Sequence, residues 1–113
     1  MQQLAVTDLA DFCAAQLAAG TAPVLLDVRE AWEVALAAIH VDGATALHIP
    51  MGEVPRRLAE IDRTRPVVCI CHHGMRSAQV VAFLAHQGAG PVYNLAGGVD
   101  AWSARVDPAV ARY

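Results

Sequence analysis

The fold of this chain is decided by an apolar run that leads into a polar loop, Pro66-Val67-Val68-Cys69-Ile70 followed by Cys71-His72-His73-Gly74-Met75-Arg76-Ser77. A short, continuous apolar run is typical of a strand buried on both faces of a parallel sheet. From Ser77 onward, apolar residues recur at helical spacing as far as Gly88, a residue type that often follows the end of a helix. The stretch therefore predicts a strand, a loop and a helix, with Cys71 where the strand ends.

The position of Cys71 favours a reactive thiol. Amide N–H groups of a loop and of a first helical turn have no intrahelical partners, so they point at whatever occupies the centre of the loop. The helix N-terminus and the charge of Arg76 both favour the thiolate, which is the nucleophilic form of cysteine. The alternative is a buried structural cysteine followed by a turn at Gly74. Because a glycine, an arginine and a helix start follow in register, we expect Cys71 to be a nucleophile.

The other thiols and the neighbouring histidines have simpler interpretations. Cys69 should point to the same face of the sheet as Cys71, one step deeper, and Cys13 is expected to fill space in the first helix. A metal site built on Cys69, Cys71, His72 and His73 is disfavoured, because neighbouring side chains at a strand end do not easily converge on one tetrahedral centre. We therefore expect no metal and no other cofactor.

Composition sets the class of protein. With 113 residues, 56% of them hydrophobic and 17% charged, the chain has the size of one compact α/β domain and can bury a core without disulfides or metal. Three cysteines without framework spacing indicate the reducing cytoplasm. The sequence shows no signal peptide and no apolar run long enough to span a bilayer, and at a net charge of −3 its basic residues are scattered. We therefore expect a cytoplasmic protein with no nucleic-acid or membrane partner.

The remaining segments alternate strands and helices. Further strands are expected at residues 4–6, 24–28, 47–49 and 91–95, and further helices at 7–19, 31–38, 53–61 and 99–105. Trp32 should lie on the packing face of its helix, and Asp27, Arg29 and Glu30 should cap that helix and tie loops together. The alternation predicts a mostly parallel five-stranded sheet with helices on both faces. We expect one domain over residues 1–113, with its core at about 4–105 and a tail, 106–113, to which the pattern assigns no role.

Taken in order, these segments resemble the single-domain rhodaneses, a family of sulfurtransferases. The resemblance covers nearly the whole chain, and its loop and second glycine motif are highly specific. The segment 39–47 is longer and less regular than the corresponding stretch of the family. The matching pieces are Leu26-Asp27-Val28-Arg29-Glu30 with Trp32-Glu33, His48-Ile49-Pro50, Cys71 to Ser77, and Asn94-Leu95-Ala96-Gly97-Gly98-Val99-Asp100-Ala101-Trp102.

The resemblance implies a single rhodanese-like α/β domain in which Cys71 holds a persulfide sulfur between two half-reactions. A thiolate would attack the outer sulfur of a donor such as thiosulfate, sulfite would leave, and cyanide or a cellular thiol would then accept the sulfur. Arg76 would be the cation at the rim of the site. The sulfur would be cradled by backbone N–H groups of His72, His73, Gly74, Met75, Arg76 and Ser77.

The length of the loop bears on a rival function. Related phosphatases of the dual-specificity kind place five residues between cysteine and arginine, which makes a pocket wide enough for phosphate. Here only the four residues from His72 to Met75 intervene. The smaller loop suits a single sulfur, so phosphatase and arsenate reductase activities are disfavoured.

Two questions stay open at this level. His72 and His73 could supply positive charge to an anionic donor at mildly acidic pH, or could contribute only their backbone amides. The chain could be an enzyme that turns over thiosulfate or a similar donor. It could instead be a carrier that accepts a persulfide from a partner protein and passes it on. A structural interaction domain is a third interpretation, and the intact Cys71 and Arg76 argue against it.

Overall fold

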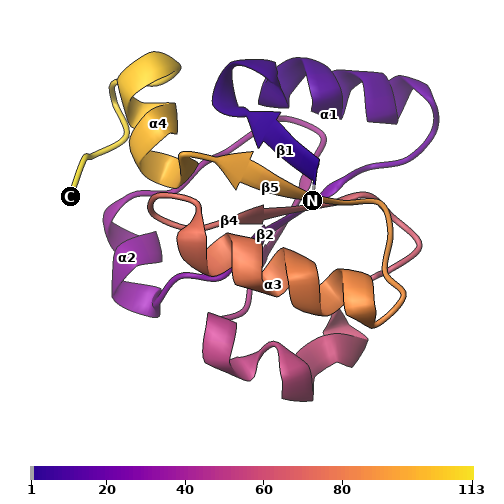
Figure 1. The fold of residues 1–113 in the computed structure, drawn as a ribbon. Coiled ribbons are helices and arrows are strands. Elements are labelled where there is room, and N and C mark those ends of the chain that lie inside the picture. Colours follow the sequence, from indigo (N-terminus) through magenta and orange to yellow (C-terminus); the bar gives the residue numbers. More distant parts are fainter. Residues whose placement is uncertain (1) are drawn as a thin grey trace.

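A five-stranded parallel sheet forms the centre of the molecule (Figure 1). The computed structural model describes residues 2–113. The strand order is β1-β5-β4-β2-β3, and every neighbouring pair is parallel, which confirms the α/β fold and extends the expected mostly parallel sheet to a fully parallel one. The strands are β1 Gln2–Ala5, β2 Val24–Asp27, β3 Thr45–His48, β4 Val67–Ile70 and β5 Val92–Ala96.

Helices cover both faces of this sheet, as expected from the alternation of segments (Figure 1). Helices α1 and α4 lie on one face, and α3 with the 3₁₀ segments η2 and η3 lies on the other. Helix α2 lies beside the carboxyl ends of the strands. The bounds are η1 Val6–Asp8, α1 Leu9–Ala18, α2 Ala31–Leu36, η2 Met51–Glu53, η3 Pro55–Glu60, α3 Met75–His86 and α4 Gly98–Arg105.

The central strand β4 shows how the sequence builds two cores. Its side chains alternate, so that Val67 and Cys69 join the cluster under α3 while Val68 and Ile70 join the cluster under α1 and α4. All four residues are at least 98% buried. Cys71 lies in the same cluster as Cys69, which confirms that the two thiols share one face of the sheet.

Two local predictions are wrong. The helix expected at residues 53–61 is instead a pair of 3₁₀ segments, because Pro55 has no N–H to donate and Arg57 leaves helical geometry at φ −110°. Trp32 is 64% exposed, because α2 has six residues and turns Glu33 inward instead. None of the helices found in residues 2–113 combines the length and the apolar character needed to cross a membrane.

Candidate active site around Cys71

Cys71 follows the central strand at the carboxyl edge of the sheet, which is the edge where α/β proteins form their ligand sites. The chain turns at Gly74, whose φ of +101° lies in the left-handed region that favours glycine. Helix α3 then begins at Met75, so that Arg76 and Ser77 belong to its first turn. Strand, loop and helix therefore follow in the predicted order, with the helix beginning at Met75 instead of Ser77.

Hydrogen-bond donors of the loop and of helix α3 contact the Cys71 sulfur. The Gly74 N–H donates to Sγ at 3.0 Å, and the Ser77 Oγ lies 3.2 Å from Sγ. The cysteine is only 1% exposed, so its sulfur is almost completely covered in the folded protein. Met75, the first residue of α3, is 78% exposed. Beside the loop lies an open depression of about 450 Å³, whose lining includes Met75, Gly74, Asn94 and Gly97.

A buried polar chain below the loop fixes the hydrogen bonds of Ser77. Asn94 Nδ2 donates to the Gly74 carbonyl and to Gln3 Oε1, both at 3.0 Å, so its Oδ1 must be the atom that accepts from the Ser77 hydroxyl at 2.6 Å. A hydroxyl has one proton, and Ser77 therefore shares it between Asn94 and the Cys71 sulfur. The sequence did not predict this use of Asn94. Its signals are a polar residue inside the apolar run of β5 and its place at the start of the second glycine motif.

The start of α4 holds the loop from the other side. The N–H groups of Val99 and Asp100 donate to the carbonyls of Cys71 and His72, both at 3.0 Å. Gly98 makes this approach possible, because a Cβ at that position would collide with both carbonyls and its φ is +57°. The second glycine motif is thus part of the site's backbone framework.

Arg76 forms an ion pair with Glu33. Its Nη1 and Nη2 donate to the two carboxylate oxygens of Glu33, both at 2.8 Å. These hydrogen bonds hold the pKa of Glu33 at about 2, well below its ordinary value, and the same pairing raises the pKa of Arg76. The charge of Arg76 is therefore neutralised by a residue of α2.

The charges after β2 hold loops together, as expected. Arg29 is fully buried, and although burial lowers its pKa, its hydrogen bonds to Asp27 and Tyr113 raise that pKa overall. Its guanidinium also donates to the carbonyls of Glu33 and Ala37.

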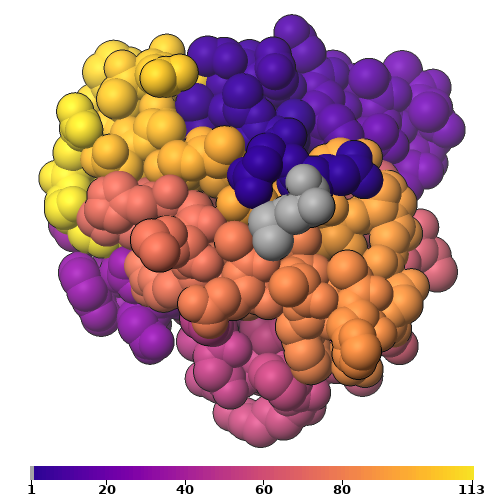
Figure 2. All heavy atoms as spheres, in the orientation of Figure 1, coloured from indigo at the N-terminus to yellow at the C-terminus, as the bar shows by residue number. Residues whose placement is uncertain are grey.

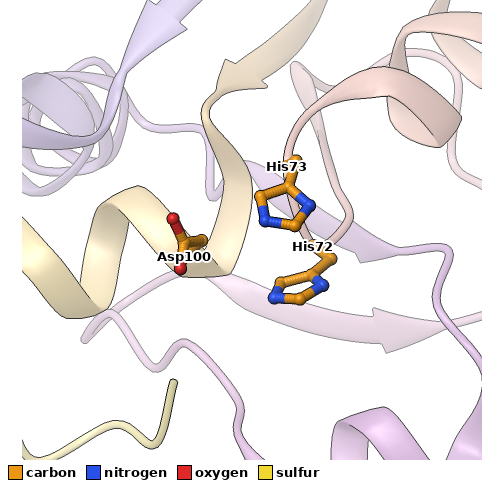
Figure 3. A group of neighbouring side chains, drawn as sticks. All are labelled: His72, His73 and Asp100. Atoms are coloured by element: carbon orange, nitrogen blue, oxygen red, sulfur yellow. The ribbon is translucent and has the colours of Figure 1, made fainter. Parts of the chain in front are cut away.

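His72 and His73 lie next to Asp100, as Figure 3 shows. Ligand atoms of the three side chains lie within 4.8 Å of one another. However, the two imidazoles stack with centroids 3.8 Å apart and planes 30° apart, so their in-plane nitrogen lone pairs run nearly side by side. Both carboxylate oxygens of Asp100 accept from Arg112. This geometry disfavours a tetrahedral metal centre.

Burial separates the side-chain roles of the two histidines. His73 is exposed, whereas His72 is half-buried between the rings of His73 and Tyr113. Desolvation and the neighbouring His73 lower the pKa of His72. Its Nε2 is buried without a hydrogen-bond partner among residues 2–113. The His72 ring is thus held by stacking and tends to be uncharged.

The other thiols are packed in the two cores. Cys13 and Cys69 are both completely buried, and all three cysteines are free. Burial raises the pKa of Cys13, and burial together with the nearby Cys71 raises the pKa of Cys69 to about 12. These thiols are protonated at neutral pH and are therefore poor nucleophiles.

Comparisons with known proteins show the family of the chain. The model of the rhodanese-like domain matches residues 10–105. A "Sulfurtransferase" of Allochromatium vinosum is 42% identical over 88 residues, which are 78% of each chain. A "Thiosulfate sulfurtransferase GlpE" of Coxiella burnetii is 38% identical over 61 residues, 54% of this chain and 57% of that protein. A crystal structure of a rhodanese-like domain protein from Staphylococcus aureus superposes with a TM-score of 0.75 at 26% identity, covering 100% of this chain and 99% of the other. The chain therefore belongs to the rhodanese-like domain family.

Proposed function

We propose that this protein is a sulfurtransferase that moves a sulfane sulfur from thiosulfate, or a similar donor, to a thiophilic acceptor through a persulfide on Cys71. The observation that carries the proposal is the environment of Sγ. A single sulfur lies at the end of the central strand, between the Gly74 N–H and the Ser77 hydroxyl. The relatives from Allochromatium vinosum, a sulfurtransferase, and from Coxiella burnetii, a thiosulfate sulfurtransferase, support the same activity.

The first half-reaction is a displacement at sulfur. The Cys71 thiolate attacks the outer sulfur of thiosulfate, a new S–S bond forms, and the old S–S bond breaks as sulfite leaves with its electron pair. The Gly74 amide and the first-turn amides of Met75 and Arg76 would stabilise the anionic sulfur, because helix-start N–H groups lack intrahelical partners.

The second half-reaction returns the thiolate. Cyanide or a thiol attacks the outer sulfur of the persulfide and leaves as thiocyanate or as a new persulfide, and Cys71 keeps the electron pair of the broken bond. No redox partner, metal or cofactor is needed for either step. Free thiols and a thiol acceptor both suit a reducing compartment such as the cytoplasm.

The test compares two variants of neighbouring cysteines. Cys71→Ser should abolish thiocyanate formation from thiosulfate and cyanide, whereas the matched control Cys69→Ser should retain most of the activity, because Cys69 is buried in the core. Incubation of the wild-type protein with thiosulfate should add the mass of one sulfur atom, which a thiol then removes. Turnover that survives in Cys71→Ser would refute the assignment.

A carrier function remains the alternative use of the same cysteine. It would accept sulfur from a persulfide-donating protein, with little turnover of thiosulfate. The two are separated by comparing the rate of thiosulfate turnover with the rate of sulfur uptake from a cysteine-desulfurase persulfide. Rapid sulfur uptake with negligible thiosulfate turnover would support the carrier function and refute the enzyme function.

A further inference from the structure

The segment after α4, to which the sequence pattern assigned no role, returns to the active-site loop. Figure 2 shows this C-terminal segment, in yellow, against the salmon surface of the loop that follows β4. The Tyr113 ring stacks on the imidazole of His72, with centroids 3.8 Å apart and planes 5° apart. The ring also packs edge-on against Trp32, with centroids 5.9 Å apart. Tyr113 therefore covers one face of a loop residue that directly follows Cys71.

The hydroxyl of Tyr113 has a defined direction. Arg29 Nη1 lies 2.8 Å from it and Glu33 Oε1 lies 2.9 Å from it. A guanidinium can only donate and an ionised carboxylate can only accept, so the phenol accepts from Arg29 and donates to Glu33. The Tyr113 oxygen thus completes the hydrogen bonds of a fully buried guanidinium and supplies a donor to the Glu33 carboxylate.

Glu33 transmits this contact to the loop. Its Oε1 accepts from Tyr113 and from Arg76 Nη2, and its Oε2 accepts from Arg76 Nη1 and from the Glu30 N–H at 2.9 Å. Four donors fix the plane of the carboxylate, and a bidentate pair fixes the guanidinium in that plane. The orientation of Arg76, in the first turn of α3, therefore depends on Tyr113.

We propose that Tyr113 is a positioning residue for the Cys71 loop and that it favours reaction with anionic sulfur donors. The inference rests on the proposed function and adds to it a residue outside the family motifs quoted above. The Tyr113 side chain contacts the His72 ring directly, and it acts on Arg76 through Glu33. Without the hydroxyl, the Glu33 carboxylate loses one of its four donors and holds the Arg76 guanidinium less firmly in one plane. An anionic donor, which uses a cation fixed beside the loop, then reacts more slowly, while a neutral reagent does not depend on that cation.

The test uses two reagents of different charge. Tyr113→Phe should slow persulfide formation from thiosulfate by about tenfold, the value of one hydrogen bond to a charged group, while alkylation of Cys71 by neutral iodoacetamide stays within about twofold of wild type. Tyr113→Ala should slow the thiosulfate reaction further. Tyr93→Phe is the matched control, because Tyr93 packs edge-on against Phe12 on the opposite face of the sheet from Cys71 and should leave both rates unchanged.

A second readout needs no sulfur chemistry. The Tyr113 ring should shift the proton resonances of the His72 imidazole, and this shift should be lost in Tyr113→Ala and kept in Tyr113→Phe. Equal slowing with both reagents would assign Tyr113 a structural role only, and unchanged rates with both would remove it from the site. A wild-type protein that forms no persulfide would overturn the proposed function itself. A functional wild type with unaffected Tyr113 variants would overturn only the role of Tyr113.

Discussion

At the scale of the residue, the Ser77 hydroxyl is the side-chain group that contacts the sulfur of the predicted nucleophile, Cys71. Ser77→Ala removes the donor that Sγ and Asn94 Oδ1 share, so iodoacetamide should alkylate Cys71 more slowly at neutral pH. It also leaves a buried amide oxygen unpaired, which should lower the free energy of unfolding by about 1–3 kcal/mol. Ser103→Ala is the control, because Ser103 is equally buried and donates to the Val110 carbonyl away from Cys71. Alkylation at the wild-type rate in Ser77→Ala, with the stability loss present, would limit the hydroxyl to a structural role.

The three thiols provide a second prediction at this scale. Exposure does not distinguish Cys71 from Cys69, since they are 1% and 0% exposed. What differs is the set of donors around the Cys71 sulfur. Burial and the nearby Cys71 raise the pKa of Cys69 to about 12. Iodoacetamide applied to the folded protein near neutral pH should therefore label Cys71 alone, as peptide mapping can show. Labelling of Cys69 or Cys13 before unfolding would contradict this ordering.

At the scale of the element, the first turn of α4 acts as the support of the loop. Gly98→Ala should destabilise the protein and slow sulfur transfer, because the new Cβ would push the carbonyls of Cys71 and His72 out of their hydrogen bonds with α4. Gly88→Ala is a matched control. Gly88 also has a positive φ, +82°, but a Cβ there would meet nothing, so only the conformational cost of about 1–2 kcal/mol remains.

Comparing Gly98→Ala with Gly88→Ala separates the effect of backbone strain from the effect of the steric clash at Gly98. Unfolding in denaturant measures the stability of both variants, and thiocyanate formation measures transfer. Sulfur transfer that falls only in Gly98→Ala would tie the glycine motif to the geometry of the loop. Equal losses of activity in the two variants would show that the close contact is unimportant.

At the scale of the whole molecule, the sequence predicts what depends on local pattern and fails where distant segments decide. Continuous apolar runs identified β2 and β4, and the apolar spacing from Ser77 onward identified α3, which begins at Met75. Trp32 was misplaced, because whether a short helix buries a tryptophan or a glutamate depends on Arg76, which lies far along the chain. Asn94 and Tyr113 went unassigned for the same reason. Their partners, Ser77, Arg29 and Glu33, come together only in the folded chain.

Glu33 connects three such segments, α2, α3 and the C-terminal tail, and this gives the stability of the molecule a defined dependence on pH. Its pKa is about 2 in the folded protein and 4.5 as an ordinary glutamate. Because the unfolded chain takes up the proton first, the stabilisation is fully present above about pH 4.5 and is lost as the pH falls from there towards 2. The shift corresponds to about 3 kcal/mol.

Glu33→Gln lacks this titration, so the wild type should be more stable than the variant at neutral pH. The difference between their free energies of unfolding should disappear on acidification. Denaturant unfolding at a series of pH values measures it. Glu60→Gln is the control, because Glu60 pairs with Arg57 at the exposed surface, where an ion pair adds little to stability. The difference in unfolding free energy between Glu60→Gln and the wild type should stay small at every pH. A gap between wild type and Glu33→Gln that does not change with pH would mean that the carboxylate joins these segments through its shape and neutral hydrogen bonds, and that its charge contributes nothing to holding Arg76 at the loop.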